Sequence, residues 1–253
     1  MSYIGNKDYN LQVLRGLVAG HTMVQMAGHN STHSTTKVTV TPNVTTKEID
    51  QSAIMATPVT VSVASTDADD TSAGAGARTV LLTGLDSSGD VQTETITLNG
   101  QTAVASTGVY SAINGIQATS WGATTYNEGD IWCGTGTFTA GVPATGYFAM
   151  EMQTNVAATA HYVVPNGKTF YLRQLIALTA STNKSINVFV EQSSNGVNWL
   201  TLANLGFESG ANPQFNPIAS PGIPAGWAIR ISAESTTTAT DISVFLAGEM
   251  IDD

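Results

Sequence analysis

The chain has 253 residues, of which 42% are hydrophobic and only 11% are charged, and its formal net charge is −10. This hydrophobic share excludes a disordered chain, and the acidic excess argues against a nucleic-acid partner, because a phosphate backbone demands clustered Lys or Arg. The single cysteine, Cys133, excludes an internal disulfide. Since no run approaches 18 apolar residues and no signal-peptide pattern opens the chain, we expect no membrane partner and folding in a cytoplasm.

The first 36 residues differ from the rest in charge and pattern. Four basic residues accompany one acidic residue over positions 1–47, whereas the remainder holds five basic and eighteen acidic residues. Apolar side chains at helical spacing predict one short amphipathic helix within Tyr9–Val18. We interpret residues 1–36 as a docking arm that becomes ordered against a partner. Its predicted contact residues are Leu11, Leu14, Leu17, Val18, Met23 and Met26.

Three histidines, His21, His29 and His33, lie in the second half of this arm. Imidazole is a common metal ligand, and His29 and His33 would share one face if the segment were helical. The Asn, Ser and Thr residues between them disfavour a helix, and no carboxylate or cysteine lies nearby in the sequence. We therefore predict an adaptable polar segment and no metal site.

From Lys37 onwards, alternating apolar and polar residues predict β-structure. The clearest element is Arg78–Gly100, where two strands flank the turn Gly84–Asp90 as in a β-hairpin. Short strands separated by Gly, Pro and Asn turns continue through the rest of the chain. The predicted fold class is all-β, with two antiparallel β-sandwich or jelly-roll-like domains that follow the arm and its one helix.

A segment rich in Gly, Pro and small residues, Ala140–Gly146, is the best candidate for a domain boundary. It divides the predicted β-structure into a domain over residues 37–139 and a C-terminal sandwich over residues 147–253.

The connection Ser65–Ala77 holds three aspartates, Asp67, Asp69 and Asp70, and its composition is similar to that of a calcium loop. The loop pattern of alternating Asp or Asn with a following Gly and a distal Glu is absent. We predict a solvated connection here and no bound ion.

No catalytic signature is present. The chain lacks a phosphate-binding glycine loop, a dinucleotide fingerprint and a Gly-x-Ser-x-Gly elbow, so we predict neither an enzyme nor a cofactor. A glycoside hydrolase that uses a carboxylate pair stays an alternative, because carboxylates are common in the chain. Four of them are expected on exposed strand or turn positions: Glu151, Glu191, Glu208 and Glu234.

Two tryptophans, Trp199 and Trp227, follow turn residues in the C-terminal half. Flat aromatic rings stack on sugar faces, so either residue is a candidate for glycan contact. The alternative is that each ring caps the hydrophobic core at one end of a sandwich.

Residues Val61–Gly100 read VSVASTDADDTSAGAGARTVLLTGLDSSGDVQTETITLNG. This stretch resembles a segment of many virion proteins of tailed bacteriophages, in which an Asp-Ala-Asp-Asp lead-in with small residues and Arg-Thr-Val precedes Gly-Leu-Asp and Glu-Thr-(apolar)-Thr-Leu-Asn-Gly. Tyr9–Asn30 is similar to the opening of such proteins, more loosely. Parts of the C-terminal half are similar in pattern to phage capsid-decoration and fibre domains.

The resemblance implies a structural component of a bacteriophage particle without enzymatic activity. We expect a capsid decoration or cement protein that is assembled in the host cytoplasm, is located in the virion, binds the major capsid protein and forms a homo-oligomer, a trimer. The alternative is a receptor-binding or fibre component that recognises host surface glycans through Trp199 or Trp227.

Overall fold

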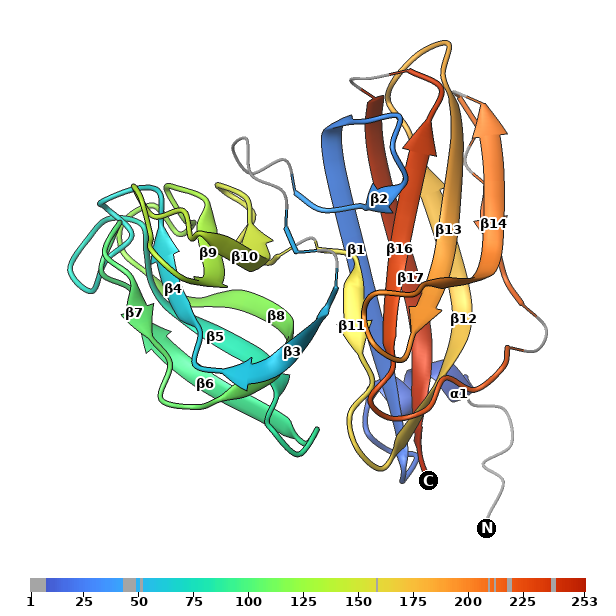
Figure 1. Ribbon diagram of the computed structural model, residues 1–253, viewed down its shortest axis with the longest axis horizontal. Coiled ribbons are helices and arrows are strands. Elements are labelled where there is room, and N and C mark those ends of the chain that lie inside the picture. Colours follow the sequence, from blue (N-terminus) through green and yellow to red (C-terminus); the bar gives the residue numbers. More distant parts are fainter. Residues whose placement is uncertain are drawn as a thin grey trace.

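The computed structural model describes residues 8–42, 49–50, 52–157, 159–208, 210–211, 213–217, 220–237 and 240–253. These residues form one short helix and seventeen strands, arranged as two β-sandwiches that lie side by side (Figure 1). All strand pairs are antiparallel. The predicted fold class is confirmed.

The first sandwich, here called the terminal sandwich, is built from both ends of the chain. One of its sheets has the order β1 (His21–His33), β17 (Thr240–Asp252), β12 (Lys168–Leu178) and β15 (Gln214–Phe215). The other has the order β11 (His161–Val163), β16 (Ala228–Ser235), β13 (Ser185–Ser193) and β14 (Leu200–Glu208), and β2 (Val38–Thr39) also pairs with β16. Side chains of both sheets fill one core, among them Met26, Phe170, Val188 and Leu246.

The second sandwich, here called the inserted sandwich, is formed by the middle of the chain. Its first sheet has the order β3 (Ile54–Val59), β8 (Tyr110–Trp121), β5 (Ala77–Leu85) and β6 (Val91–Thr97). Its second sheet has the order β10 (Thr145–Met150), β9 (Ile131–Thr135), β4 (Ser62–Ser65) and β7 (Val104–Ala105). The predicted hairpin is present as β5 and β6, with Thr79 opposite Thr97 and Leu85 opposite Val91.

The predicted boundary at Ala140–Gly146 does not separate the two sandwiches. This segment leads into β10, which pairs back onto β9, and the backbone of Thr139 and Val142 closes a tight turn there. Gly, Pro and small residues mark a hairpin turn as readily as they mark a linker. The terminal sandwich instead combines residues on either side of the insertion, so neither predicted domain range matches one sandwich.

The prediction that residues 1–36 form a docking arm is wrong for their second half, which is part of a sheet. Residues 21–33 form β1, which pairs along its length with β17, and Met26 is only 5% exposed in the terminal core. The burial of Val24, Met26 and Gly28 alternates with more exposed neighbours, as expected for an amphipathic strand. Residues 1–7 of the predicted arm lie outside the described residues.

The aspartate-rich connection is organised around Asp70, which is fully buried. Its carboxylate accepts hydrogen bonds from the backbone N–H groups of Ala77 at 2.7 Å, Glu128 at 2.9 Å and Gly129 at 2.9 Å, and from the Ser65 hydroxyl at 2.6 Å. The connection was expected to be solvated, but at this residue it forms a buried hydrogen-bond network. Among the described residues, no group of three or more His, Cys, Asp or Glu side chains is placed to hold a metal ion.

Steric constraints explain the small residues next to this hydrogen-bond network. A Cβ atom on Gly76 would lie 2.2 Å from Asp70 Oδ1, which is far inside van der Waals contact. Glycine is thus required where the backbone approaches the buried carboxylate. This packing accounts for part of the small-residue run in the segment with phage resemblance.

The hydrogen-bond network around Asp70 leads to a prediction about stability. We expect Asp70→Ala to lower the free energy of unfolding by at least about 3 kcal/mol, because four buried donors lose a charged acceptor. Asp69→Ala is the matched control, since Asp69 is exposed, and its expected effect is within about 0.5 kcal/mol. Urea unfolding of both variants measures the difference. Equal urea midpoints for the two variants would show that this network contributes nothing to the free energy of unfolding.

Candidate interaction sites

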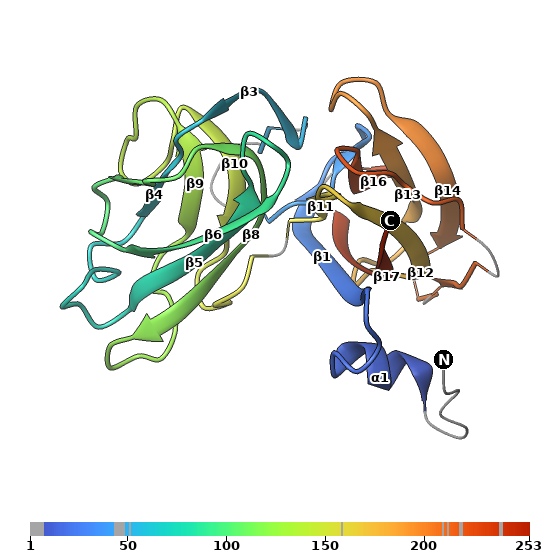
Figure 2. The same ribbon diagram turned by 90° about the horizontal axis from the view of Figure 1, so that it is seen from below.

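The short helix α1 (Tyr9–Leu14) lies outside the terminal sandwich, on the side of the sheet that contains β1 and β17 (Figure 2). The Asp8 carboxylate caps its first turn and accepts from the N–H of Asn10 at 3.0 Å and of Leu11 at 3.4 Å. Gln12 and Val13 are buried. The helix is therefore fixed on the sandwich by one face.

The buried carboxylate of Glu249 on β17 anchors this helix by binding its first residue, Tyr9. Oε1 accepts from the Tyr9 hydroxyl at 2.5 Å and from His21 Nδ1 at 2.6 Å, and Oε2 accepts from the Arg173 guanidinium, whose Nε lies at 3.0 Å. Burial alone would raise the pKa of Glu249, but these donors outweigh it and hold the pKa below its ordinary value. The carboxylate consequently stays charged and keeps Tyr9 in place.

Three leucines on α1 and the turn that follows it are exposed. Leu11 is 49% exposed, Leu14 58% and Leu17 55%, and we call these three residues the leucine patch. Of the other predicted contact residues, Val18 and Met23 are half-buried, and Met26 belongs to the terminal core. Three of the six predicted contact residues are therefore exposed, and Met26 is too deeply buried to contact a partner.

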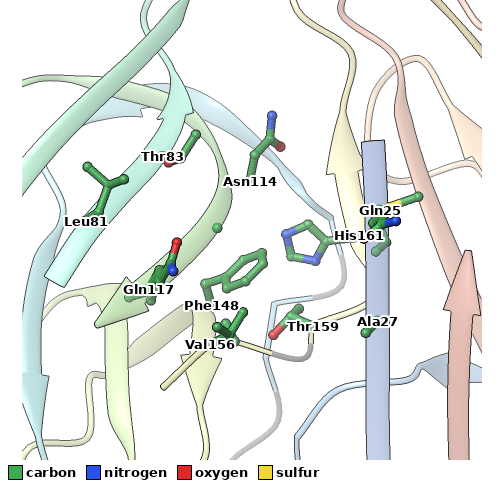
Figure 3. Close-up of a pocket in the computed structure, with 14 residues that line it drawn as sticks. Gln25, Ala27, Leu81, Thr83, Asn114, Gln117, Phe148, Val156, Thr159 and His161 are labelled. Carbon is green, nitrogen blue, oxygen red and sulfur yellow. The ribbon is translucent and has the colours of Figure 1, made fainter. Parts of the chain in front are cut away.

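A pocket of about 230 Å³ lies between the two sandwiches (Figure 3). One wall is formed by β1 of the terminal sandwich, with Gln25 and Ala27. The opposite wall is formed by β5 and β8 of the inserted sandwich, with Thr83 and Gln117. Sequence reasoning missed this pocket, because its walls are more than fifty residues apart in the chain and no local pattern connects them.

The floor of the pocket contains His161, which is buried and meets the ring of Phe148 edge-on, with ring centroids 5.0 Å apart. Its Nε2–H donates to the carbonyl of Ile113 at 3.2 Å. Burial lowers the pKa of His161 to about 4, so its imidazole is neutral at neutral pH. The pocket therefore has a neutral floor.

The two tryptophans do not form one platform. The Arg230 guanidinium lies over the Trp199 ring, 4.0 Å from its centroid, and Trp199 packs against a small cluster between the sandwiches. Trp227 packs against the core of the terminal sandwich. Both positions favour the interpretation that these rings cap hydrophobic clusters.

The three N-terminal histidines are also kept apart. His21 contacts Glu249, and the Nε2–H of His33 donates to the Ala233 carbonyl at 2.7 Å. His29 lies between two carboxylates, 3.5 Å from Glu151 and 3.6 Å from Asp241. Each of the three histidines therefore has its own set of contacts.

Glu191 differs from its predicted exposure, because its side chain is fully buried. It accepts from Arg230 at 2.8 Å, from Ser232 at 2.7 Å and from Lys37 at 2.6 Å. Burial would raise the pKa of this carboxyl, and these donors hold it below its usual range. Glu191 of β13 thus binds two residues of β16 and Lys37, which precedes β2, and is occupied by structural contacts.

No protein-family model matches the chain, and no curated protein is similar to it in sequence. Among solved structures, the infectious bursal disease virus VP2 subviral particle matches 92% of this chain and 72% of its own, with 10% identity and a TM-score of 0.23. The structure of the infectious bursal disease virus Gx strain has the same coverage, 12% identity and a TM-score of 0.26. Similarity at this level transfers no function to the chain. No helix among the described residues is long and apolar enough to cross a membrane.

His161 generates a prediction about pH. Its pKa is about 4 in the folded chain and ordinarily 6.5, so the unfolded chain takes up a proton first as the pH falls. Through this residue the folded state should lose about 3 kcal/mol of stability as the pH falls from above 7 to 4, most of it below pH 6.5. Chemical unfolding of the wild type and of His161→Gln across this range isolates the contribution. Parallel pH profiles of the two proteins would contradict it.

Proposed function

We propose that this chain is a structural protein of a bacteriophage particle, which binds the capsid as a decoration or cement protein through the leucine patch. The resemblance of Val61–Gly100 to virion proteins of tailed bacteriophages supports the choice of particle. The observation that carries the mode of attachment is the exposure of Leu11, Leu14 and Leu17 on α1 and the turn that follows it, where Glu249 holds the helix in place through Tyr9. The proposed partner is the major capsid protein.

The leucine patch is suited to docking because it is ordered before it meets a partner. Burying a leucine side chain completely contributes about 1.5–3 kcal/mol, so three half-exposed leucines supply roughly 3–4 kcal/mol per copy. A flexible arm would lose much of this gain to conformational entropy. The fixed helix avoids most of that cost, and several copies in one oligomer would bind by avidity.

The exposed face of β6 in the inserted sandwich fits a role in a crowded protein shell. Thr93, Thr95 and Thr97 are exposed along β6 and carry no charge. Hydroxyl side chains contact neighbouring copies without the large desolvation cost of charged groups. We include self-association into a trimer in the proposal, following the resemblance to phage decoration proteins.

The alternative virion role, glycan recognition by a fibre or receptor-binding protein, depends on an open aromatic face. One face of the Trp199 ring is covered by Arg230, and Trp227 packs against the terminal core. These contacts make the tryptophans the weaker basis for a function, and we favour capsid binding.

Substitution of the leucine patch tests the capsid-binding role. We expect Leu11→Ser combined with Leu14→Ser and Leu17→Ser to weaken binding to undecorated capsids of the parent phage by about 100-fold or more, from the lost apolar burial. Co-sedimentation of purified protein with such capsids measures the change. The protein should stay folded, because Gln12 and Val13, not the leucines, face the sandwich.

The matched control replaces two exposed apolar residues on a different part of the chain, Val197→Ser with Leu200→Ser, whose side chains are 74% and 60% exposed. Capsid binding by this control should be unchanged. Full binding by the leucine-patch variant, or equal loss in both variants, would refute docking through α1.

The proposed trimer is tested by light scattering. We expect a mass three times the 26.3 kDa of one chain at micromolar concentration. Three linked patches would then compensate for the modest contribution of each. A monomer in solution, together with isolated copies in a density map of the particle, would rule out the trimer while leaving capsid binding open to its own test.

A further inference from the structure

The pocket between the sandwiches presents polar groups that the fold does not use. Gln25 and Thr83 project from β1 and β5, and Gln117 projects from β8 (Figure 3). In the part of the chain that the structure describes, none of these three side chains makes a hydrogen bond within the protein. By contrast, the Asn114 amide nearby is occupied, since it donates to the Val163 carbonyl at 2.9 Å and accepts from the Val163 N–H at 2.8 Å.

The lining of the pocket selects the charge of its ligand. It contains no Asp, Glu, Lys or Arg among the described residues, and the buried His161 is neutral at neutral pH. An ion placed here would lose hydration without gaining a charged partner. The chemistry of the walls therefore favours an uncharged ligand.

We propose that this pocket binds a neutral, hydroxyl-rich ligand, namely one sugar residue, which the amides of Gln25 and Gln117 hold from opposite walls. Each glutamine amide offers a carbonyl acceptor next to two N–H donors, which matches the adjacent hydroxyl groups of a sugar ring. Thr83 adds a hydroxyl that both donates and accepts.

Apolar side chains complete the match to a sugar. Ala27, Leu81 and Val156 line the same space and offer contact to the C–H groups of a sugar ring. The volume of about 230 Å³ is below the roughly 300–1,000 Å³ typical of sites for drug-sized ligands. A single ring fills it, and a longer glycan would continue into solvent.

This site is separate from the leucine patch and goes beyond the proposed capsid attachment. The patch lies on α1, which is outside the pocket lining, and the pocket uses β1, β5 and β8. A bound sugar would contact both sandwiches at once. Capsid binding and sugar binding are thus expected to be lost through different substitutions.

Saturation-transfer NMR with the full chain tests the proposal. The probes are the methyl glycosides of glucose, galactose, mannose and N-acetylglucosamine, with glucuronic acid and glucosamine as charged comparisons. We expect binding of at least one neutral glycoside, and binding at least about tenfold weaker in the Gln25→Ala and Gln117→Ala double variant. Gln214→Ala is the matched control, because Gln214 is an exposed strand glutamine outside the pocket lining.

Several outcomes would overturn the proposal. These are no binding of any neutral glycoside, binding that the double variant leaves unchanged, and stronger binding of a charged sugar. A self-association that the double variant abolishes would identify the pocket as a contact between copies instead. Co-sedimentation of the double variant with capsids separates the two roles, since failure of sugar binding leaves the leucine-patch result untouched.

Discussion

The antiparallel ladder between β1 and β17 is the contact on which the arrangement of the whole chain depends. It runs from the pair His21 and Ile251 to the pair His33 and Thr240 and closes the terminal sandwich around the insertion. The same two strands support both candidate sites, because β17 carries the Glu249 anchor of α1 and β1 provides one wall of the pocket. Without this ladder, neither the leucine patch nor the pocket would have a defined position.

The pocket also requires the two sandwiches to be held together. The reciprocal hydrogen bonds between Asn114 and Val163 join β8 to β11, and His161 reaches the carbonyl of Ile113 across the same boundary. A small apolar cluster that includes Leu85 and Ala228 packs beside them. Neutral hydrogen bonds and apolar contacts thus form this part of the junction, and His29 of β1 adds a contact with the Glu151 carboxylate of the inserted sandwich. Within the terminal sandwich, Glu191 satisfies the buried charge of Arg230.

The sequence predicts local features well and distant pairings poorly. The β5–β6 hairpin follows from alternation and a turn within one short stretch, so its residues carry the whole signal. The pairing of β1 with β17 joins opposite ends of the chain, and no local pattern reports it. Buried Glu191 and Glu249 were missed for the same reason, since Arg230 and Arg173 are distant in sequence. The short helix at Tyr9–Leu14 could be predicted, because helical spacing is local, whereas the role of its leucines stays a proposal.

The split origin of the terminal sandwich has a consequence during synthesis. β1 leaves the ribosome first among the strands, yet β17, its partner in the ladder, is made last. At about 5–20 residues per second, the interval between them is roughly 10–40 seconds. The last strand of the inserted sandwich is synthesised well before that interval ends. The edge of β1 therefore stays unpaired while the inserted sandwich beside it is already folded. On a polysome, where copies lie close together, such a strand is exposed to exchange with another chain.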